Sequence, residues 1–380
     1  MIELMFYALF VASTLISVYL VVKLQFAFKH FQMKKLVSES TMIDDLPSVS
    51  VCIPARNETH AMTGCLESVI ASTYPKLEII VLDDSSIDDT SILIKSFAHA
   101  GVRFVEGSKL TGEWLGKNHA LQELMLEASG TYVLFMDVDT LIGPDTIGQL
   151  VAYAKSEDAT MVSVLPRRAD GWRGSVIFAP LRYFRELVMH SKKTPATASN
   201  AWMINRRTLR DEMNGFNDLK NHVQPEAKIA ARLTVQNKYR FLIGTELLGV
   251  NYEKKWSSQI ETSIRLLYPT LGGNLVKNIL AVIALTIVIL PAIILPIALA
   301  YDLVYIQIFS LWQLCVYIAI YAEYLSKVWR HNWWLGALLW PAIVVQELIL
   351  VIISVVRYRL GTVTWKGRRI TTQASIKVSE

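Results

Sequence analysis

Cysteine is scarce in this sequence, and so are glycine-rich loops. The three cysteines, Cys52, Cys65 and Cys315, form no CxxC pair and are odd in number. This excludes a disulfide framework and indicates a reducing compartment. A Walker-type glycine-rich phosphate loop is also missing, which disfavours a phosphoryl-transfer enzyme. The sequence contains no internal repeats and no low-complexity tract.

Charge is almost missing from four apolar stretches, residues 5–22, 279–300, 304–322 and 333–356. Each is close to the roughly 20 residues that a helix needs to cross a bilayer. With 52% hydrophobic residues, the chain is too apolar for an ordinary soluble protein. We therefore expect a folded domain with several membrane segments: an N-terminal transmembrane anchor at residues 1–24, a domain at 45–260, C-terminal membrane segments at 277–357 and a basic tail at 358–380.

The basic residues lie where membrane flanks place them. The net charge is only +5, and Lys23, Lys29, Lys34 and Lys35 follow the first apolar stretch. This pattern favours a bilayer surface over nucleic acid as the partner. The first stretch has no basic segment before it and no clear cleavage site, so we expect an uncleaved anchor. The prediction is a multi-pass protein of the cell membrane whose main domain is cytoplasmic.

Between the apolar ends, strands alternate with helices. Apolar runs predict strands at residues 48–53, 77–82, 102–105 and 131–136, with Pro54 ending the first. Helical spacing predicts helices at residues 59–72, 88–98 and 117–128. This alternation indicates an α/β domain with a mainly parallel sheet covered on both faces.

Polar residues gather where these strands end. The clusters are Pro54-Ala55-Arg56-Asn57-Glu58, Asp83 to Thr90, Gly116 to Ala120, and Asp137-Val138-Asp139. Singly, each has an ordinary structural explanation, such as a helix N-cap or a solvated turn. Together they matter more, because the carboxyl ends of such strands meet at one rim, where α/β sheets bind ligands.

The chemistry of this rim suits a nucleotide-sugar diphosphate. Mg²⁺ and Mn²⁺ bind carboxylate and phosphate oxygens. Asp137 and Asp139 can divide the work, with one on the metal and one on the ribose or sugar. The metal then stabilises charge on the leaving diphosphate, and Lys117 adds a positive charge.

The motifs PARNE, DDSSIDDT, GEWLGKNHA and DVD, in this order and spacing, resemble glycosyltransferase family 2 with the GT-A fold. The resemblance covers residues 47–240 by motif and extends more loosely to the tail. Within the family, Gly112 to Ala120, the single N-terminal span and Trp365-Lys366-Gly367-Arg368 are most similar to the 4,4'-diaponeurosporenoate and hopanoid-associated glycosyltransferases.

The resemblance implies a role for each matching residue. Pro54, Ala55, Asn57 and Glu58 would line the nucleobase and ribose pocket. Asp83 and Asp84 match an acidic pair whose first member usually meets the uracil. Lys117 matches a donor-side loop, Asp137 would contact the ribose or sugar, and Asp139 the divalent cation. The implied donor is a UDP-sugar, with UDP-glucose as the default, and the implied mechanism is inverting.

One departure from the family pattern affects the acceptor side. An acidic pair usually supplies the base that deprotonates the acceptor hydroxyl, but here Glu226 falls on the base position and Pro225 replaces its acidic neighbour. Proline and glutamate also suit the first turn of a helix, so Glu226 has both interpretations. A carboxylic acid acceptor, with a pKa of about 4 to 5, arrives already ionised and needs less base catalysis. This favours a lipid acceptor such as an apocarotenoid carboxylic acid.

The Arg-Trp acceptor motif of the family is also missing in clean form, and residues 259–265 occupy its region. Residues 172–190 are instead rich in aromatics and arginine, which fits either a core helix with a basic face or an interfacial helix that guides a lipid. The rivals are another lipid acceptor such as a hopanoid or glycolipid, an exopolysaccharide synthase, and a non-catalytic membrane scaffold.

The last apolar stretch poses a topological conflict. If it crosses the bilayer, the tail with Arg357, Arg359, Lys366 and Arg368 lies opposite the cytoplasmic domain, against the positive-inside rule. Pro341 and Glu347 lie within the stretch. We therefore expect a re-entrant or interfacial segment, with the tail near the active site.

Overall fold

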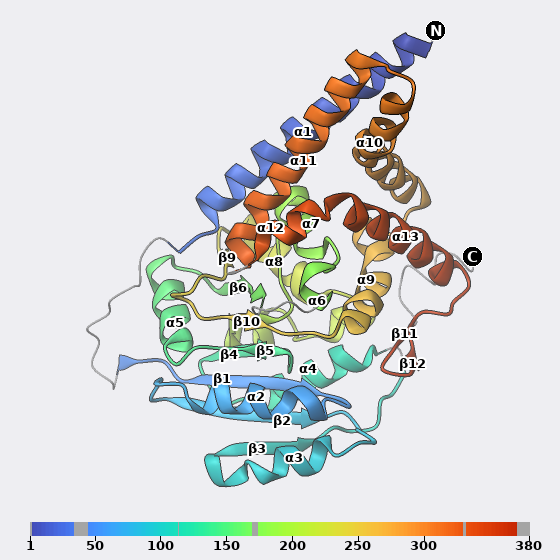
Figure 1. Cartoon of the computed structure of the whole chain (residues 1–380). Helices are drawn as coiled ribbons and strands as arrows, with labels where there is room; N and C mark the ends of the chain where they lie inside the picture. The colour runs from blue at the N-terminus through green and yellow to red at the C-terminus, as the bar shows by residue number, and fades with distance from the viewer. Residues whose placement is uncertain (1, 34–44, 113, 169–173, 330–331, 371–380) are drawn as a thin grey trace.

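The structure is a computed structural model that describes residues 2–33, 45–112, 114–168, 174–329 and 332–370. A seven-stranded sheet forms the centre of one part, and long apolar helices project from it (Figure 1). The strands follow the order β3-β2-β1-β4-β8-β6-β9. Their bounds are β1 Val49–Ala55, β2 Leu77–Asp83, β3 Val102–Glu106, β4 Tyr132–Met136, β6 Met161–Leu165, β8 Ala201–Asn205 and β9 Tyr239–Ile243.

The sheet is mixed. Strands β3, β2, β1 and β4 are parallel neighbours, whereas β8 is antiparallel to both β4 and β6. The helices of this part are α2 Thr59–Ile70, α3 Thr90–Ser96, α4 Gly116–Glu127, α5 Thr146–Ser156, α6 Gly174–Ile177, α7 Arg182–Met189, α8 Pro225–Val235 and α9 Trp256–Thr270. A small second sheet joins β5 Thr140–Leu141, β10 Asn251–Tyr252 and β7 Arg167–Arg168. The α/β class and the mixed sheet confirm the fold expected from the alternating pattern.

Two local expectations were wrong. Strand β1 continues through Pro54, which pairs with Leu82 of β2. Pairing with β4 stops at Cys52, so the missing N–H of Pro54 costs no ladder bond. Residues 174–190 form α6 and α7 instead of one helix, with Pro180 in the break; Trp172 and Arg173 lie outside the described residues.

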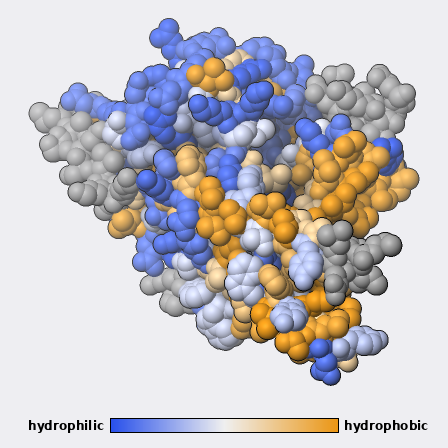
Figure 2. Space-filling view, turned by 90° about the horizontal axis from the view of Figure 1, so that it is seen from above, coloured by the Kyte–Doolittle hydropathy of each residue, from blue (hydrophilic) through white to orange (hydrophobic). Residues whose placement is uncertain are grey.

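Four helices are long and apolar enough to span a membrane. They are α1 (span Phe6–His30 of Ile2–His30), α10 Leu275–Ala300, α11 Val304–Val328 and α13 Trp340–Arg359. The short α12 Trp333–Leu338 precedes α13, and the hairpin β11 Thr364–Trp365 with β12 Arg368–Arg369 follows it. In Figure 1, α1, α10 and α11 project away from the sheets, whereas α13 runs across the domain. Figure 2 shows hydrophobic side chains gathered on the face seen from above, which carries these helices.

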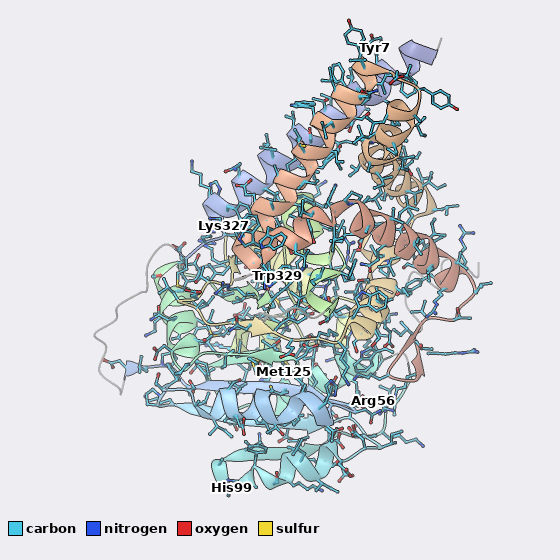
Figure 3. The ribbon with its side chains drawn as sticks, viewed as in Figure 1. Tyr7, Arg56, His99, Met125, Lys327 and Trp329 are labelled. Atoms are coloured by element: carbon cyan, nitrogen blue, oxygen red, sulfur yellow. The ribbon has the colours of Figure 1, made fainter. Side chains whose placement is uncertain are left out.

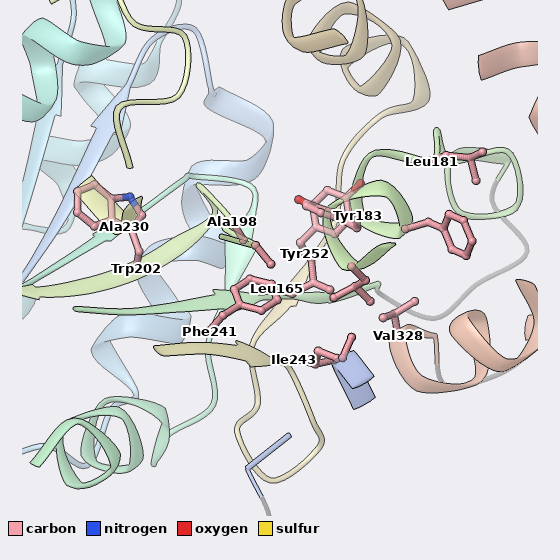
Figure 4. Packing of buried hydrophobic residues seen from close by; sticks show 14 of the residues in the cluster. Leu165, Leu181, Tyr183, Ala198, Trp202, Ala230, Phe241, Ile243, Tyr252 and Val328 are labelled. Carbon is pink, nitrogen blue, oxygen red and sulfur yellow. The ribbon is translucent and has the colours of Figure 1, made fainter. Parts of the chain in front are cut away.

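One buried cluster joins the sheet to the long apolar helices. It includes Leu165, Phe241 and Ile243 of the strands and Val328 at the end of α11 (Figure 4). Trp329 is fully buried beside Arg168, and Figure 3 places it where α11 meets the domain. The apolar helices are therefore packed onto the domain instead of being tethered by a linker.

Candidate active site

The end of β1 contributes to a pocket wall and to a hydrogen-bonded contact between two loops. Pro54, Ala55 and Glu58 line a pocket at the carboxyl ends of the strands. Asn57 is not among the lining residues. It has a positive φ of 52°, which asparagine tolerates, and its Oδ1 accepts a hydrogen bond from the amide of Ile87 at 2.9 Å. Asn57 therefore connects the loop after β1 to the loop after β2.

The two acids at the end of β2 point to different places. Asp83 is buried and accepts hydrogen bonds from the hydroxyls of Ser86, in the following loop, and Ser91, in the first turn of α3. Asp84 lines the pocket and accepts two bonds from Nη1 of Arg368, at 2.7 and 2.9 Å. Burial raises the pKa of Asp84, and Arg368 only partly offsets this effect. The second member of the pair, not the first, therefore faces the pocket.

The residues after β4 form two ion pairs. Asp137 Oδ1 lies 2.5 Å from Nζ of Lys117, at the start of α4. Asp139 Oδ2 lies 3.0 Å from Nζ of Lys254, just before α9. Burial acts to raise the pKa of Asp137, but the ammonium groups of Lys117 and Lys254 outweigh it and hold the pKa below its usual range. Asp137 is therefore ionised, and its negative charge two residues from Asp139 suits a bound cation.

Asp139 keeps one oxygen available. Its Oδ1 is buried and has no hydrogen-bond partner among the described residues. A buried carboxylate oxygen without a partner is costly, and a divalent cation would satisfy it. No group of three or more His, Cys, Asp or Glu side chains in the described part of the chain converges to hold a metal. The residues therefore fit a cation that takes one carboxylate from Asp139 and most of its other ligands from a bound diphosphate.

The C-terminal hairpin, residues 364–369, covers the pocket. Besides the Arg368–Asp84 pair, Lys366 Nζ lies 2.9 Å from Oε1 of Glu58. Trp365 and Lys366 belong to the pocket lining. The hairpin also closes onto α4: a Cβ added at Gly116 would lie 2.9 Å from Nη1 of Arg368 and 3.2 Å from the Trp365 ring. A larger residue at position 116 would require the Arg368 guanidinium and the Trp365 ring to shift.

One face of α9 completes the wall. Ser258, Glu261, Thr262 and Arg265 line the pocket, and Glu261 and Thr262 each lie three or four residues from both Ser258 and Arg265. The Arg265 guanidinium lies over the Trp365 ring, 5.8 Å from its centroid. Burial lowers the pKa of Arg265, with the nearby Arg182 adding to the effect. Arg265 thus adds a positive charge, desolvated by the hairpin, beside the pocket.

Glu226 lies below this surface. It is buried in the first turn of α8, and its Oε1 has no hydrogen-bond partner within the described ranges. Burial raises its pKa, with partial compensation from Lys117. Arg182 and Asp137 are its other charged neighbours. Glu226 does not line the pocket itself, but its charged neighbours Lys117 and Asp137 do.

The structure thus brings Pro54, Ala55, Glu58, Asp84, Lys117, Asp137 and Asp139 to one pocket. Asn57 and Asp83 stabilise its loops, and Glu226 lies behind it. The sequence analysis expected the tail near the active site, but it missed Lys254 as a partner of Asp139 and the pairs of Lys366 with Glu58 and of Arg368 with Asp84. A local signal for the hairpin was the WKGR segment, because Lys366 and Gly367, both with positive φ, form the two-residue turn between β11 and β12.

A sheet with this order, with acidic and basic residues at the strand ends, is the arrangement of a GT-A nucleotide-sugar transferase domain. A mannosyltransferase from Pyrobaculum calidifontis, solved in complex with GDP-Man and Mn2+, shares the fold at a TM-score of 0.55 and 18% identity, over 93% of this chain and 98% of that one. Residues 50–212 match the glycosyl transferase family 2 model, so the chain contains a domain of that family.

Curated relatives agree with this assignment. The 4,4'-diaponeurosporenoate glycosyltransferases of Staphylococcus aureus strains bovine RF122 / ET3-1 and MRSA252 are each 28% identical over 138 residues. The match spans 36% of this chain and 36% of the length of each relative. The family model and the curated relatives both carry the name glycosyltransferase, and the segment that the family model matches supplies much of the pocket lining.

Proposed function

We propose that this chain is a membrane-bound glycosyltransferase that moves a sugar from a UDP-sugar, with UDP-glucose as the default, to a lipid carboxylic acid. The observation that supports it most is the Asp137–Asp139 cluster. The carboxyl groups of Asp137 and Asp139 pair there with Lys117 and Lys254, and one buried oxygen of Asp139 has no hydrogen-bond partner among the described residues and can take a divalent cation. This set of charges suits a diphosphate and a metal in the same pocket.

On this proposal each donor-side residue has a task. Pro54, Ala55 and Glu58 bound the nucleoside, and Asp137 meets the ribose or sugar. Asp139 holds Mg²⁺ or Mn²⁺, which when bound neutralises charge on the diphosphate. Lys117 and Arg265 supply positive charge beside the leaving group. The acceptor oxygen forms its bond to the anomeric carbon as the bond to UDP breaks, so the configuration inverts and no enzyme nucleophile is needed.

The acceptor side supports a carboxylic acid. Glu226 stands alone beside Pro225 and is buried behind Lys117, a poor position for taking a proton from an acceptor in the pocket. An apolar acid ionised at neutral pH needs no such base. The name of the Staphylococcus aureus relatives also points to a carotenoid acid, since they carry 4,4'-diaponeurosporenoate as their substrate name. An apocarotenoid carboxylic acid is therefore our proposed acceptor.

The test uses the full chain in lipid vesicles with Mg²⁺ or Mn²⁺. UDP-glucose, UDP-GlcNAc and GDP-mannose are offered in turn, each with an apolar acid and with the alcohol of the same chain. We expect nucleotide release with UDP-glucose and the acid, together with an alkali-labile ester. Asp139→Ala should abolish turnover, whereas Asp211→Ala, an exposed acid remote from the pocket, should not.

Other outcomes discriminate the rivals. Transfer only to the alcohol, or loss in Glu226→Gln as severe as in Asp139→Ala, contradicts a carboxylic acid acceptor. A polymeric product indicates an exopolysaccharide synthase, and product on a hopanoid or glycolipid indicates another lipid acceptor. No nucleotide release with any donor, membrane lipid or metal favours a non-catalytic scaffold.

A further inference from the structure

Helix α13 contacts the catalytic domain along its whole length. Trp340, in its first turn, packs against Phe184 of α7 with ring centroids 5.8 Å apart. Seven residues on, Glu347 is buried and pairs with Arg185 of α7 at 2.7 Å. At the far end, Ser354 and Tyr358 donate to the α9 carbonyls of Ile264 and Arg265 at 2.6 and 2.7 Å.

This line of contacts is incompatible with a helix that leaves the domain to cross a bilayer. Trp340 and Tyr358 are separated by about 27 Å along a helix axis, close to the thickness of a hydrocarbon core. A crossing helix would take one of them to the opposite membrane surface. Here both remain against α7 and α9.

The segments at the two ends of α13 give the same result. On one side, Trp329 is fully buried beside Arg168, at the base of α11. On the other, Arg368 of the hairpin pairs with Asp84 at the donor pocket. A helix that crosses once places its ends on opposite sides, so α13 does not cross. In contrast, Figure 3 shows Tyr7 of α1 far from the sheets and Lys327 of α11 close to them.

The opposite face of α13 is an exposed apolar stripe. It consists of Val345, Ile349, Ile352 and Val356, each between 44% and 48% exposed. Their spacing of four, three and four residues places them on one side of the helix. Two exposed tryptophans of α12, Trp333 and Trp334, lie just before it, and tryptophan is enriched at membrane surfaces.

We propose that α13 lies in the plane of the membrane surface, with the stripe of Val345, Ile349, Ile352 and Val356 in the boundary between headgroups and acyl chains. The occupant of this face is the lipid bilayer itself, because the neighbouring α1, α10 and α11 carry exposed apolar residues that require the same solvent. The protein then crosses the bilayer three times, and the hairpin stays on the side of the donor pocket. This inference concerns membrane placement and holds whichever sugar or acceptor the enzyme uses.

Depth measurements test the proposal directly. Single cysteines are placed at the four stripe positions in a Cys315→Ser background and labelled with an environment-sensitive fluorophore in vesicles with lipids brominated at known depths. The control is the exposed face of α11 at Ile308, Trp312, Cys315 (retained) and Ala319, which has the same spacing. Both sets span about 16 Å along the axis. We expect one common depth for α13 and a graded depth for α11.

A second measurement covers the case in which labels disturb packing. Single cysteines replace three exposed residues: Thr362 after α13, Ser191 in the catalytic domain and Asp302 between α10 and α11. Each variant is treated with a membrane-impermeant maleimide in sealed vesicles. Thr362 should react from the same side as Ser191 and opposite Asp302. A graded depth along α13, or reaction of Thr362 together with Asp302, would overturn the proposal.

Discussion

Arg368 and Asp84 lie 284 residues apart in the chain, yet Nη1 of Arg368 contacts both carboxylate oxygens of Asp84, at 2.7 and 2.9 Å. The Asp84 side chain is 6% exposed, so the pair is largely removed from water. It joins the C-terminal hairpin to the end of β2. The pocket therefore depends on a segment that follows the last apolar helix.

Replacing Arg368 with alanine should weaken donor binding, because Asp84 is left buried without its counter-ion and the hairpin loses its anchor. We expect the KM for the nucleotide sugar to rise by about 10-fold or more, with a stability loss of about 1–3 kcal/mol. Kinetics and thermal unfolding in detergent measure the two effects. The exposed neighbour Arg369 is the control, and equal KM values for Arg368→Ala and Arg369→Ala would contradict the anchoring role.

Gly116→Ala should displace the hairpin while leaving the sheet intact. The added Cβ would meet Nη1 of Arg368 at 2.9 Å, Oδ2 of Asp84 at 3.1 Å and the Trp365 ring at 3.2 Å. Fluorescence should show that the Trp365 ring becomes more exposed. The KM for the donor should rise by about 10-fold if displacement of the hairpin weakens donor binding by roughly 1.4 kcal/mol. Gly148→Ala, with its nearest atom at 3.8 Å, serves as the control. Unchanged kinetics in Gly116→Ala would show that the hairpin yields freely.

Lys254→Gln should tighten metal binding in the absence of donor. The Lys254 ammonium lies 3.0 Å from Oδ2 of Asp139 and competes with a divalent cation for that carboxylate. A unit charge at this range is worth a few kcal/mol at an effective dielectric of about 20, so an increase in Mn²⁺ affinity of at least about 10-fold is expected.

Mn²⁺ titration followed by electron paramagnetic resonance measures this affinity. Lys192→Gln, an exposed lysine, controls for net charge, and Asp139→Ala should remove the binding. If Lys254→Gln binds Mn²⁺ no better than the Lys192 control, Asp139 is not the metal ligand.

Glu226→Gln should make stability less dependent on pH. Burial raises the pKa of Glu226 above its ordinary 4.5. Below pH 4.5 the carboxyl is protonated in both states. As the pH rises, it ionises first in the unfolded chain, so its contribution to stability falls until the folded carboxyl also ionises.

The glutamine variant removes that loss, so its Tm relative to the parent chain should increase as the pH is raised above 4.5. Thermal unfolding in detergent between pH 4 and pH 8 gives the comparison. Glu212→Gln, an exposed acid, should show no such trend. A constant difference for Glu226→Gln across this range would mean that the Glu226 pKa is not raised.

Much of the donor side could be predicted because its signals are local. Asp137 and Asp139 directly follow an apolar strand, and Lys117 begins a helix whose spacing is clear, so their places follow from short segments. The rim where they meet is a general property of such sheets. The positions of residues at the strand ends can therefore be predicted without knowledge of tertiary contacts.

The partners of these residues could not be predicted, because they come from distant segments. Lys254 reaches Asp139 from beyond β10, and Lys366 reaches Glu58 from beyond α13. Lysine and arginine in a basic tail suit a membrane flank equally well, so composition alone does not distinguish the two. The orientation of Asp83 could not be predicted either. Its carboxylate accepts hydrogen bonds from Ser86 and Ser91, so it does not line the pocket.

The hairpin also has a consequence for biosynthesis. The ribosome makes Pro54 early and Arg368 more than 300 residues later, after the apolar helices α10 and α11. A nascent chain thus carries the strand ends long before it carries the segment that pairs with them. The pocket is completed only after α10, α11 and α13 have been synthesised, so a chain truncated before residue 364 would lack one wall of the pocket.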